Sequence, residues 1–100
     1  MDIVYSQNKV PIRLTAERWF HIIENHDDLA GHYDEILQTI EEPDFIIKGY
    51  KEALAAVTKI KAGLYLSVIY KETYTNDGFV ITAYFTSSLK KEAMIWQKES

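Results

Sequence analysis

The chain of 100 residues contains no cysteine, no long apolar run and no surplus of basic residues. Without cysteine there can be no disulfide and no thiolate metal centre, which suits a reducing compartment, and we expect a cytoplasmic protein. Residues 1–14 lack the basic segment and apolar core of a secretion signal, and no apolar run approaches the roughly 20 residues of a membrane span. We therefore expect no membrane association.

The chain has enough apolar material for one folded unit. Hydrophobic residues make up 47% of it, so a chain of this length can bury one continuous core, and residues 1–100 are expected to form a single domain. The net charge of −4 argues against indiscriminate binding to nucleic acid. Residues 1–50 carry four basic and ten acidic side chains, whereas residues 51–100 carry seven and five. An anion site should therefore lie mainly in the second half.

Two amphipathic helices are predicted in the first half of the chain. Thr15 is the expected N-cap of the first helix, with Glu17 in its first turn, and the helix should end near residues 25–28. Its apolar positions follow the i, i+3, i+4, i+7 pattern of a buried stripe: Ala16, Trp19, Phe20 and Ile23. The second helix has a similar stripe and closes at residues 42–43: Leu29, Tyr33, Ile36, Leu37 and Ile40.

Strand patterns follow the helices. β-Branched and apolar residues predict strands at 44–50, 53–61, 64–72 and 79–86, with turns at 62–63 and 75–78. In the last strand Phe79, Ile81, Ala83 and Phe85 alternate with Val80, Thr82, Tyr84 and Thr86, which predicts one apolar face and one face with hydroxyls. The tail fits either a short helix or a loop followed by a strand at 93–97, and we favour the loop and strand.

This order predicts an α+β fold, in which two N-terminal helices pack on one face of a curved, roughly four-stranded antiparallel sheet. The opposite face of the sheet would then be free for function.

Two of the three histidines lie on the first predicted helix. On a helical wheel His21 lies at about 140° and His26 at about 280° from Ala16. A two-histidine zinc site needs i, i+4 spacing, so this pair does not predict zinc. The simple alternatives are an exposed helix histidine for His21 and a C-terminal histidine favoured by the helix dipole for His26. His32 is expected to be structural.

Two further sets of residues could serve a site. The hydroxyls of Thr82, Tyr84, Thr86 and Ser87 would cross the open sheet face, although Thr and Tyr are also ordinary strand formers. Lysines stand near strand ends, where they also protect sheet edges: Lys48, Lys51, Lys59, Lys61 and Lys71. The sequence has no glycine-rich phosphate loop and no nucleophile elbow.

The order of these features resembles a known family. Residues 12–46 begin "IRLTAERWFHIIENH" and end in "PDFI", and residues 81–87 read "ITAYFTS". This combination resembles the phage-associated branch of the barnase, EndoU, colicin and RelE-like (BECR) ribonuclease superfamily, over about residues 10–90. The chain departs from the pattern at Asp27, where the family often has proline.

The resemblance implies N-terminal helices against a four-stranded sheet, and RNA cleavage of toxin or effector type that needs no metal or cofactor. Carried over by position, the catalytic candidates are His21, His26, Thr82, Tyr84 and Ser87, with Lys51, Lys71 and Thr86 as substrate-binding candidates. An antitoxin or immunity protein would be the protein partner. Because the wheel separates the histidines, one site can use both only if the helix ends before His26 or His26 turns back over the sheet.

Two other functions remain open from the sequence. The same fold could be a non-catalytic domain that binds a protein or nucleic acid, which the overall acidity favours. It could also be a structural or processing module of a phage, excised from a longer chain.

Overall fold

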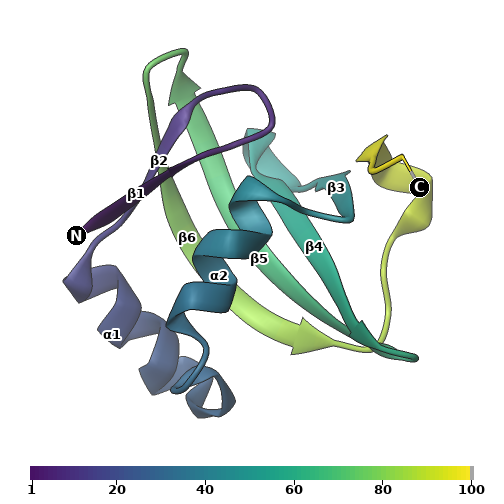
Figure 1. Cartoon of the computed structure of the whole chain (residues 1–100), viewed down its shortest axis with the longest axis horizontal. Coiled ribbons are helices and arrows are strands. Elements are labelled where there is room, and N and C mark those ends of the chain that lie inside the picture. Colours follow the sequence, from purple (N-terminus) through teal and green to yellow (C-terminus); the bar gives the residue numbers. More distant parts are fainter. Residues whose placement is uncertain (100) are drawn as a thin grey trace.

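The computed structural model describes residues 1–99 and has two α-helices and seven strands. The helices are α1 (Ala16–Asn25) and α2 (Tyr33–Glu41), and three short 3₁₀ turns are η1 (Asp27–Leu29), η2 (Tyr50–Glu52) and η3 (Lys91–Ala93). The strands are β1 (Asp2–Tyr5), β2 (Pro11–Leu14), β3 (Phe45–Lys48), β4 (Leu54–Lys61), β5 (Leu64–Tyr74), β6 (Asp77–Thr86) and β7 (Met94–Gln97). Figure 1 shows both helices on one side of the sheet.

All seven strands form one mixed sheet in the order β1-β2-β6-β5-β4-β3-β7. Neighbouring strands are antiparallel except β2 and β6, which pair in parallel through Ile12 and Arg13. The α+β class is confirmed, but the expected sheet of about four antiparallel strands is wrong in number and in type. The four-residue strands β1 and β2 are too short to show a clear alternation, and their attachment to β6 joins residues far apart in the sequence.

The main core lies between the sheet and the helices. Its helical members are Ile22 of α1 and Ile36 and Ile40 of α2, and all three are fully buried. The sheet contributes a larger buried set: Ile12, Leu14, Ala56, Leu66, Val68, Tyr70, Val80 and Ala83. Burying a side chain such as isoleucine contributes about 1.5–3 kcal/mol, so this layer fixes the helices to one face.

Helix α1 begins and ends where the sequence pattern indicates. Thr15 is its N-cap and accepts a hydrogen bond from the Arg18 amide over 3.1 Å. His26 is its C-cap, with φ −138° and ψ 74°, so the chain leaves the helical register at this residue. The later start of α2 at Tyr33 places Leu29 in η1 instead of the helix. Within residues 1–99, neither helix combines the length and apolar character needed to cross a membrane.

A bulge in β6 changes which of its side chains face the core. Tyr70 of β5 pairs with Val80, but the preceding Ile69 pairs with Thr82, so Ile81 is an extra residue. One extra residue reverses the alternation of a strand. The predicted apolar face of β6 is therefore wrong in its first half, because Val80 belongs to the main core and Ile81 lines the opposite face.

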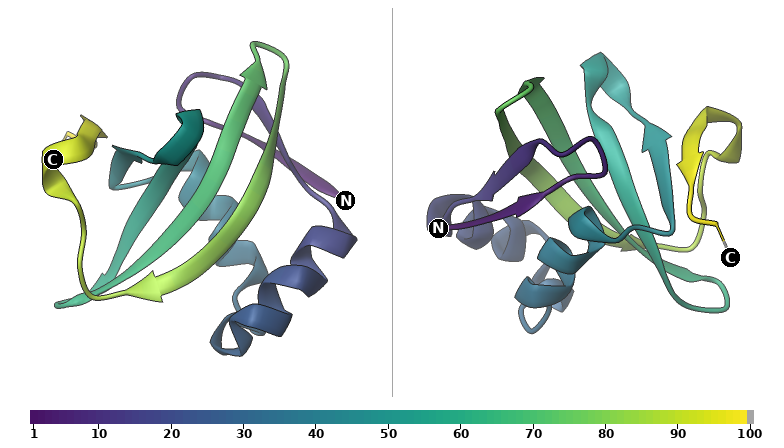
Figure 2. Two further views of the ribbon diagram at one scale, coloured as in Figure 1. Left: turned by 180° about the vertical axis from the view of Figure 1, so that it is seen from behind. Right: turned by 45° about the horizontal axis from the view of Figure 1, so that its top comes forward.

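The predicted loop and strand after β6 are confirmed, since β7 (Met94–Gln97) follows a loop and the short turn η3. After β6 the chain runs past the free face of the sheet and through η3, and β7 then pairs antiparallel with β3. Figure 2, which shows the molecule from behind, displays the face of β4, β5 and β6 without a helix over it. This face and the segment after β6 form the candidate site.

Candidate functional site

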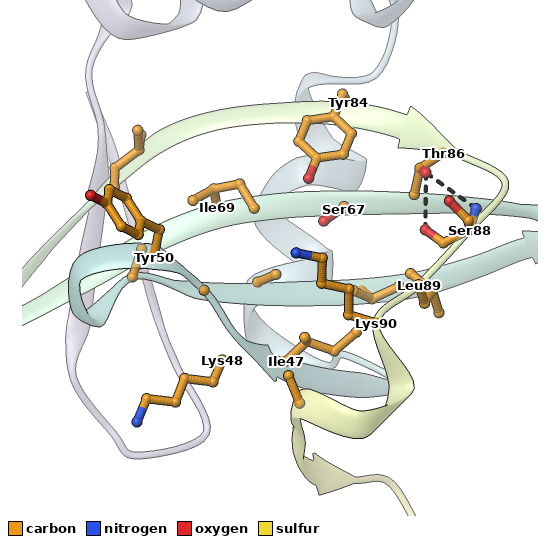
Figure 3. A pocket seen from close by; sticks show the side chains of 16 residues that line it. Ile47, Lys48, Tyr50, Ser67, Ile69, Tyr84, Thr86, Ser88, Leu89 and Lys90 are labelled. Atoms are coloured by element: carbon orange, nitrogen blue, oxygen red, sulfur yellow. Dashed lines mark hydrogen bonds between the residues drawn. The ribbon is translucent and has the colours of Figure 1, made fainter.

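A cleft of about 890 Å³ lies on the sheet face opposite the helices. Its floor is formed by β3 to β6. Its sides are formed by η2 and by residues 88–93, which follow β6 and are called the tail segment below. The volume is at the upper end of the range typical of small-molecule sites. The side chains drawn in Figure 3 line it: Ile47, Lys48, Tyr50, Ala53, Ala55, Val57, Ser67, Ile69, Ile81, Tyr84, Thr86, Ser88, Leu89, Lys90 and Ala93, together with the backbone of Gly49.

The charge of the cleft differs from that of the chain. Among the described residues that line it, two are lysines, Lys48 and Lys90, and none is acidic. The whole chain nevertheless carries a net charge of −4. Of the two amines, that of Lys90 points into the cleft and that of Lys48 points away from its centre (Figure 3). Because no described lining residue carries a carboxylate, the Lys90 charge makes the cleft electrostatically suited to an anionic ligand.

Three polar groups point into the same part of the cleft. Figure 3 shows the hydroxyls of Ser67 and Tyr84 and the amine of Lys90 directed toward one another from β5, β6 and the tail segment. Ser67 is nearly buried, with 3% of its surface exposed, and it pairs across the sheet with Tyr84. A lysine amine donates hydrogen bonds, and hydroxyls both donate and accept them, so this group can hold an oxygen-rich anion such as a phosphate.

Thr86 organises the chain at the end of β6. Its hydroxyl donates to the Ser88 carbonyl over 3.0 Å and accepts from the Ser88 amide over 3.3 Å. Both bonds are drawn in Figure 3. They set the direction in which the tail segment leaves the strand toward Lys90. Thr86 is thus a positioning residue in this structure, and the neighbouring Ser87 is exposed and does not line the cleft.

His26 lies beside Tyr84, which lines the cleft, but His26 is not itself a lining residue. Its ring centroid lies 6.0 Å from that of Tyr84, and the two rings are tilted by 41°. Helix α1 is tied to β6 nearby, because Nη1 of Arg18 donates to the Ile81 carbonyl over 3.2 Å. The helix ends before His26, which is one of the two arrangements that the sequence requires if both helix histidines are to share a site.

The other histidines lie elsewhere. His21 is exposed and borders a separate hollow of about 620 Å³ with Glu17, Arg18, Phe20 and Glu24. Nδ1 of His32 lies 2.6 Å from Oε1 of Glu35, and its ring packs edge-on against Phe85. The structure therefore brings His26 to Tyr84 but does not bring His21 to the same place.

The remaining sequence candidates lie around the cleft. Thr82 is half-buried and pairs with Ile69, and Lys71 is half-buried farther along β5, where it pairs with Phe79. Neither lines the cleft. Lys51 in η2 also lies outside the lining, but its Nζ is 5.5 Å from the ring centroid of Tyr50, which does line it.

Several lining residues were not singled out from the sequence, and three of them matter for the chemistry of the cleft: Tyr50, Ser67 and Lys90. Ser67 had a signal, since it is a small polar residue inside the apolar run "LYLSVIY". Tyr50 follows a glycine between two lysines, which is a weak signal. Lys90 had none, because its place depends on the path of the tail across the sheet.

Within residues 1–99, no cluster of three histidine or acidic side chains is arranged to hold a metal ion. No protein-family model, no curated protein and no solved structure matches the chain. The resemblance to the BECR ribonucleases therefore stays a prediction from the sequence.

Proposed function

We propose that the chain is a small, metal-independent RNA endonuclease that works in the cleft opposite the helices. The observation that carries the proposal is the lining of the cleft, where the Lys90 amine points inward and, among the described residues, no side chain is acidic. Since the chain as a whole is acidic, this local charge favours a phosphate-bearing substrate over random contact with anions. The toxin or effector role, with an antitoxin or immunity partner, rests on the sequence resemblance.

Cleavage without metal uses the 2′-hydroxyl of RNA as the nucleophile. Its oxygen attacks the neighbouring phosphorus and gives its proton to a base. The bond from phosphorus to the 5′-oxygen breaks, and an acid protonates that oxygen, which leaves a 2′,3′-cyclic phosphate and a 5′-hydroxyl. Charge on the phosphorane must be stabilised meanwhile. A protein therefore needs two proton-transfer groups and a cation at one place.

We assign proton transfer to His26 and Tyr84 and charge stabilisation to Lys90. Histidine suits proton transfer because its ordinary pKa near 6.5 makes both forms available near neutral pH. His26 is next to Tyr84, whose hydroxyl points into the cleft beside Lys90. His21 has no part in this assignment, because it borders the separate hollow on α1.

The test is cleavage of a labelled single-stranded RNA in EDTA by the wild type and two histidine variants. His26→Ala is expected to lower the rate by about 10²- to 10⁴-fold, the usual contribution of a general acid or base. His21→Ala is the matched control and should cut at the wild-type rate. An all-DNA oligonucleotide should stay intact, since it lacks the 2′-hydroxyl.

Two results would contradict the proposal. Equal rates for the wild type and His26→Ala would remove His26 from catalysis. No cleavage by the wild type under any of several salt conditions would remove the nuclease activity itself.

A non-catalytic binding domain is the second candidate, and one observation favours it. No histidine is among the described residues that line the cleft, since His26 meets Tyr84 from outside. If RNA bound to the wild type is recovered intact after long incubation, this function replaces the nuclease. A salt-insensitive association with a protein and none with RNA would identify a protein partner instead.

A further inference from the structure

The η2 turn presents an exposed aromatic ring at the cleft. Tyr50 is 82% exposed and stands at the end of the cleft away from Ser88 (Figure 3). Single exposed apolar side chains are common on protein surfaces, so the Tyr50 ring is of interest because of its place at the cleft and the groups around it. The turn is nevertheless well defined, because the Ala53 amide donates to the Tyr50 carbonyl over 3.1 Å and the Gly49 amide donates to the Ala53 carbonyl over 2.8 Å.

The backbone of this turn is strained. Lys51 and Glu52 have φ values of 51° and 66°, and neither is glycine. Two successive side chains in the left-handed region cost of order 1–3 kcal/mol each. Such strain persists only where the surrounding structure enforces it, and its frequent location is a ligand-binding site.

The amine of Lys51 lies close to the Tyr50 ring. Nζ of Lys51 lies 5.5 Å from the ring centroid, within the distance of a cation–π contact. An exposed aromatic ring next to lysines is the arrangement that single-stranded nucleic acid uses, because a free base stacks on the ring while the cations attract the backbone. Paired strands keep their bases stacked inside the helix and do not offer them in this way.

Lys90 supplies the matching group for a phosphate. Its amine points into the cleft with the hydroxyls of Ser67 and Tyr84, whereas the amine of Lys48 points away from them (Figure 3). Tyr50 and Lys90 both line the same cleft, from η2 on one side and from the tail segment on the other.

We infer that Tyr50 and Lys90 form a nucleotide subsite, in which a base of single-stranded RNA stacks on Tyr50 and a phosphate of the same strand binds Lys90. The inference rests on the proposed function for the identity of the ligand, and it adds one residue that selects an unpaired base and one that binds a phosphate. Tyr50 discriminates by stacking, which needs an unpaired base. Lys90 binds through charge, which does not depend on the base.

The test measures binding of an oligonucleotide with 2′-O-methyl groups, about ten residues long, which the proposed reaction cannot cleave. Tyr50→Ala should weaken binding of the single strand by about 5- to 100-fold, the usual effect of removing one stacked base. Tyr50→Phe should keep wild-type affinity, since its ring remains. The matched control is Tyr74→Ala, which removes another exposed tyrosine, 69% exposed in β5, and should change nothing.

The salt dependence separates the two residues. Lys90→Gln should reduce the slope of log affinity against log salt by about 0.7, the value for one phosphate contact in a single strand. Tyr50→Ala should leave that slope unchanged. The control for charge is Lys61→Gln, which alters an exposed lysine at the end of β4 and should keep the wild-type slope. With the complementary strand annealed, Tyr50→Ala and the wild type should bind equally.

The outcomes distinguish this inference from the proposed function. If the oligonucleotide binds the wild type but Tyr50→Ala and Lys90→Gln behave as their controls do, the subsite is wrong, and cleavage still decides the nuclease independently. If both variants lose affinity as expected while the wild type cuts no RNA, the subsite is supported and the proposed nuclease activity is wrong. If the oligonucleotide does not bind the wild type at low salt, the subsite is wrong.

Discussion

Tyr84 connects the helical layer to the cleft. Its ring contacts His26 at the end of α1, and its hydroxyl points into the cleft beside Lys90. A tyrosine is suited to this position because its apolar ring packs against a neighbour while its hydroxyl stays available. The neighbouring Thr86 differs, since its hydroxyl is already bonded to Ser88. The two residues belong to one strand but have different roles.

Tyr70 presents a contrasting case in the main core. It is fully buried, and its hydroxyl has no hydrogen-bond partner among the described residues. A buried hydroxyl without a partner costs free energy relative to water. Tyr70→Phe is therefore expected to leave the free energy of unfolding within about 1 kcal/mol of the wild type or to raise it. Urea unfolding of both proteins measures the difference.

The control for Tyr70→Phe removes the ring as well. Tyr70→Ala should cost about 3–5 kcal/mol, as expected for an aromatic side chain deleted from a core. A loss above about 1 kcal/mol for Tyr70→Phe would mean that the hydroxyl is satisfied, for example by a buried water, and would contradict the prediction.

At the scale of elements, the sequence predicted what depends on local pattern. Helix α1, its N-cap Thr15 and the strands β3 to β7 follow from periodicity and turn residues. The β1–β2 hairpin was missed because each strand has only four residues and β1 is largely exposed. The bulge at Ile81 was missed because it appears only when β6 is paired with β5.

The residues of the candidate site, too, were predictable only where they belong to a local sequence pattern. Tyr84, Thr86 and Lys48 were candidates from the sequence, and all three line the cleft. Tyr50 and Lys90 reach the same cleft from elements that are not neighbours in the chain. Only the antiparallel arrangement of the sheet and the return of the tail to β3 bring them together, and no local pattern encodes that.

Gly78 allows the parallel contact between β2 and β6. A Cβ at this position would lie 2.5 Å from Cδ1 of Ile12 and 2.6 Å from the carbonyl oxygen of Lys71. The carbonyl belongs to the β5 backbone and cannot move freely, so a methyl group would push strands apart. Gly78→Ala is expected to lower the free energy of unfolding by about 1–3 kcal/mol, the range for overpacking, as measured by urea unfolding.

Gly31 provides the matched control for this substitution. A Cβ there would meet no atom within 4 Å. Gly31→Ala should therefore keep or slightly raise stability, since alanine restricts the unfolded chain. Equal stability of the two variants would show that β2 and β6 tolerate a wider separation, against the prediction.

At the scale of the whole molecule, the sheet separates two charge environments. The first half of the chain, with ten acidic side chains, supplies both helices, and these cover the face away from the cleft (Figure 1). Most of the cleft lining comes from the second half, where the sequence placed any anion site. The fold thus keeps much of the negative charge away from the lysines of the cleft, so an acidic protein can still attract an anion there.

The stability of the whole fold should fall in alkaline solution because of two tyrosines. Tyr33 donates a hydrogen bond to Oδ2 of Asp2 over 2.6 Å, and its partial burial, with this bond and the Asp2 charge, raises its pKa to about 12. Burial, with the charge of Glu72, also raises the pKa of Tyr70. In the unfolded chain both groups titrate near pH 10.

Stability changes with pH because the folded and the unfolded chain bind different numbers of tyrosine protons. Above about pH 10 the unfolded chain releases the tyrosine protons while the folded protein keeps them, so stability is lost as the pH rises from about 10 through about 12. Tyr33→Phe removes one of these groups and should make the fall less steep, although the lost bond to Asp2 lowers its stability at neutral pH. Tyr74→Phe, which alters an exposed tyrosine, should follow the wild type. Urea unfolding from about pH 8 to about pH 11 measures the slopes, and equal slopes for Tyr33→Phe and the wild type would contradict the prediction.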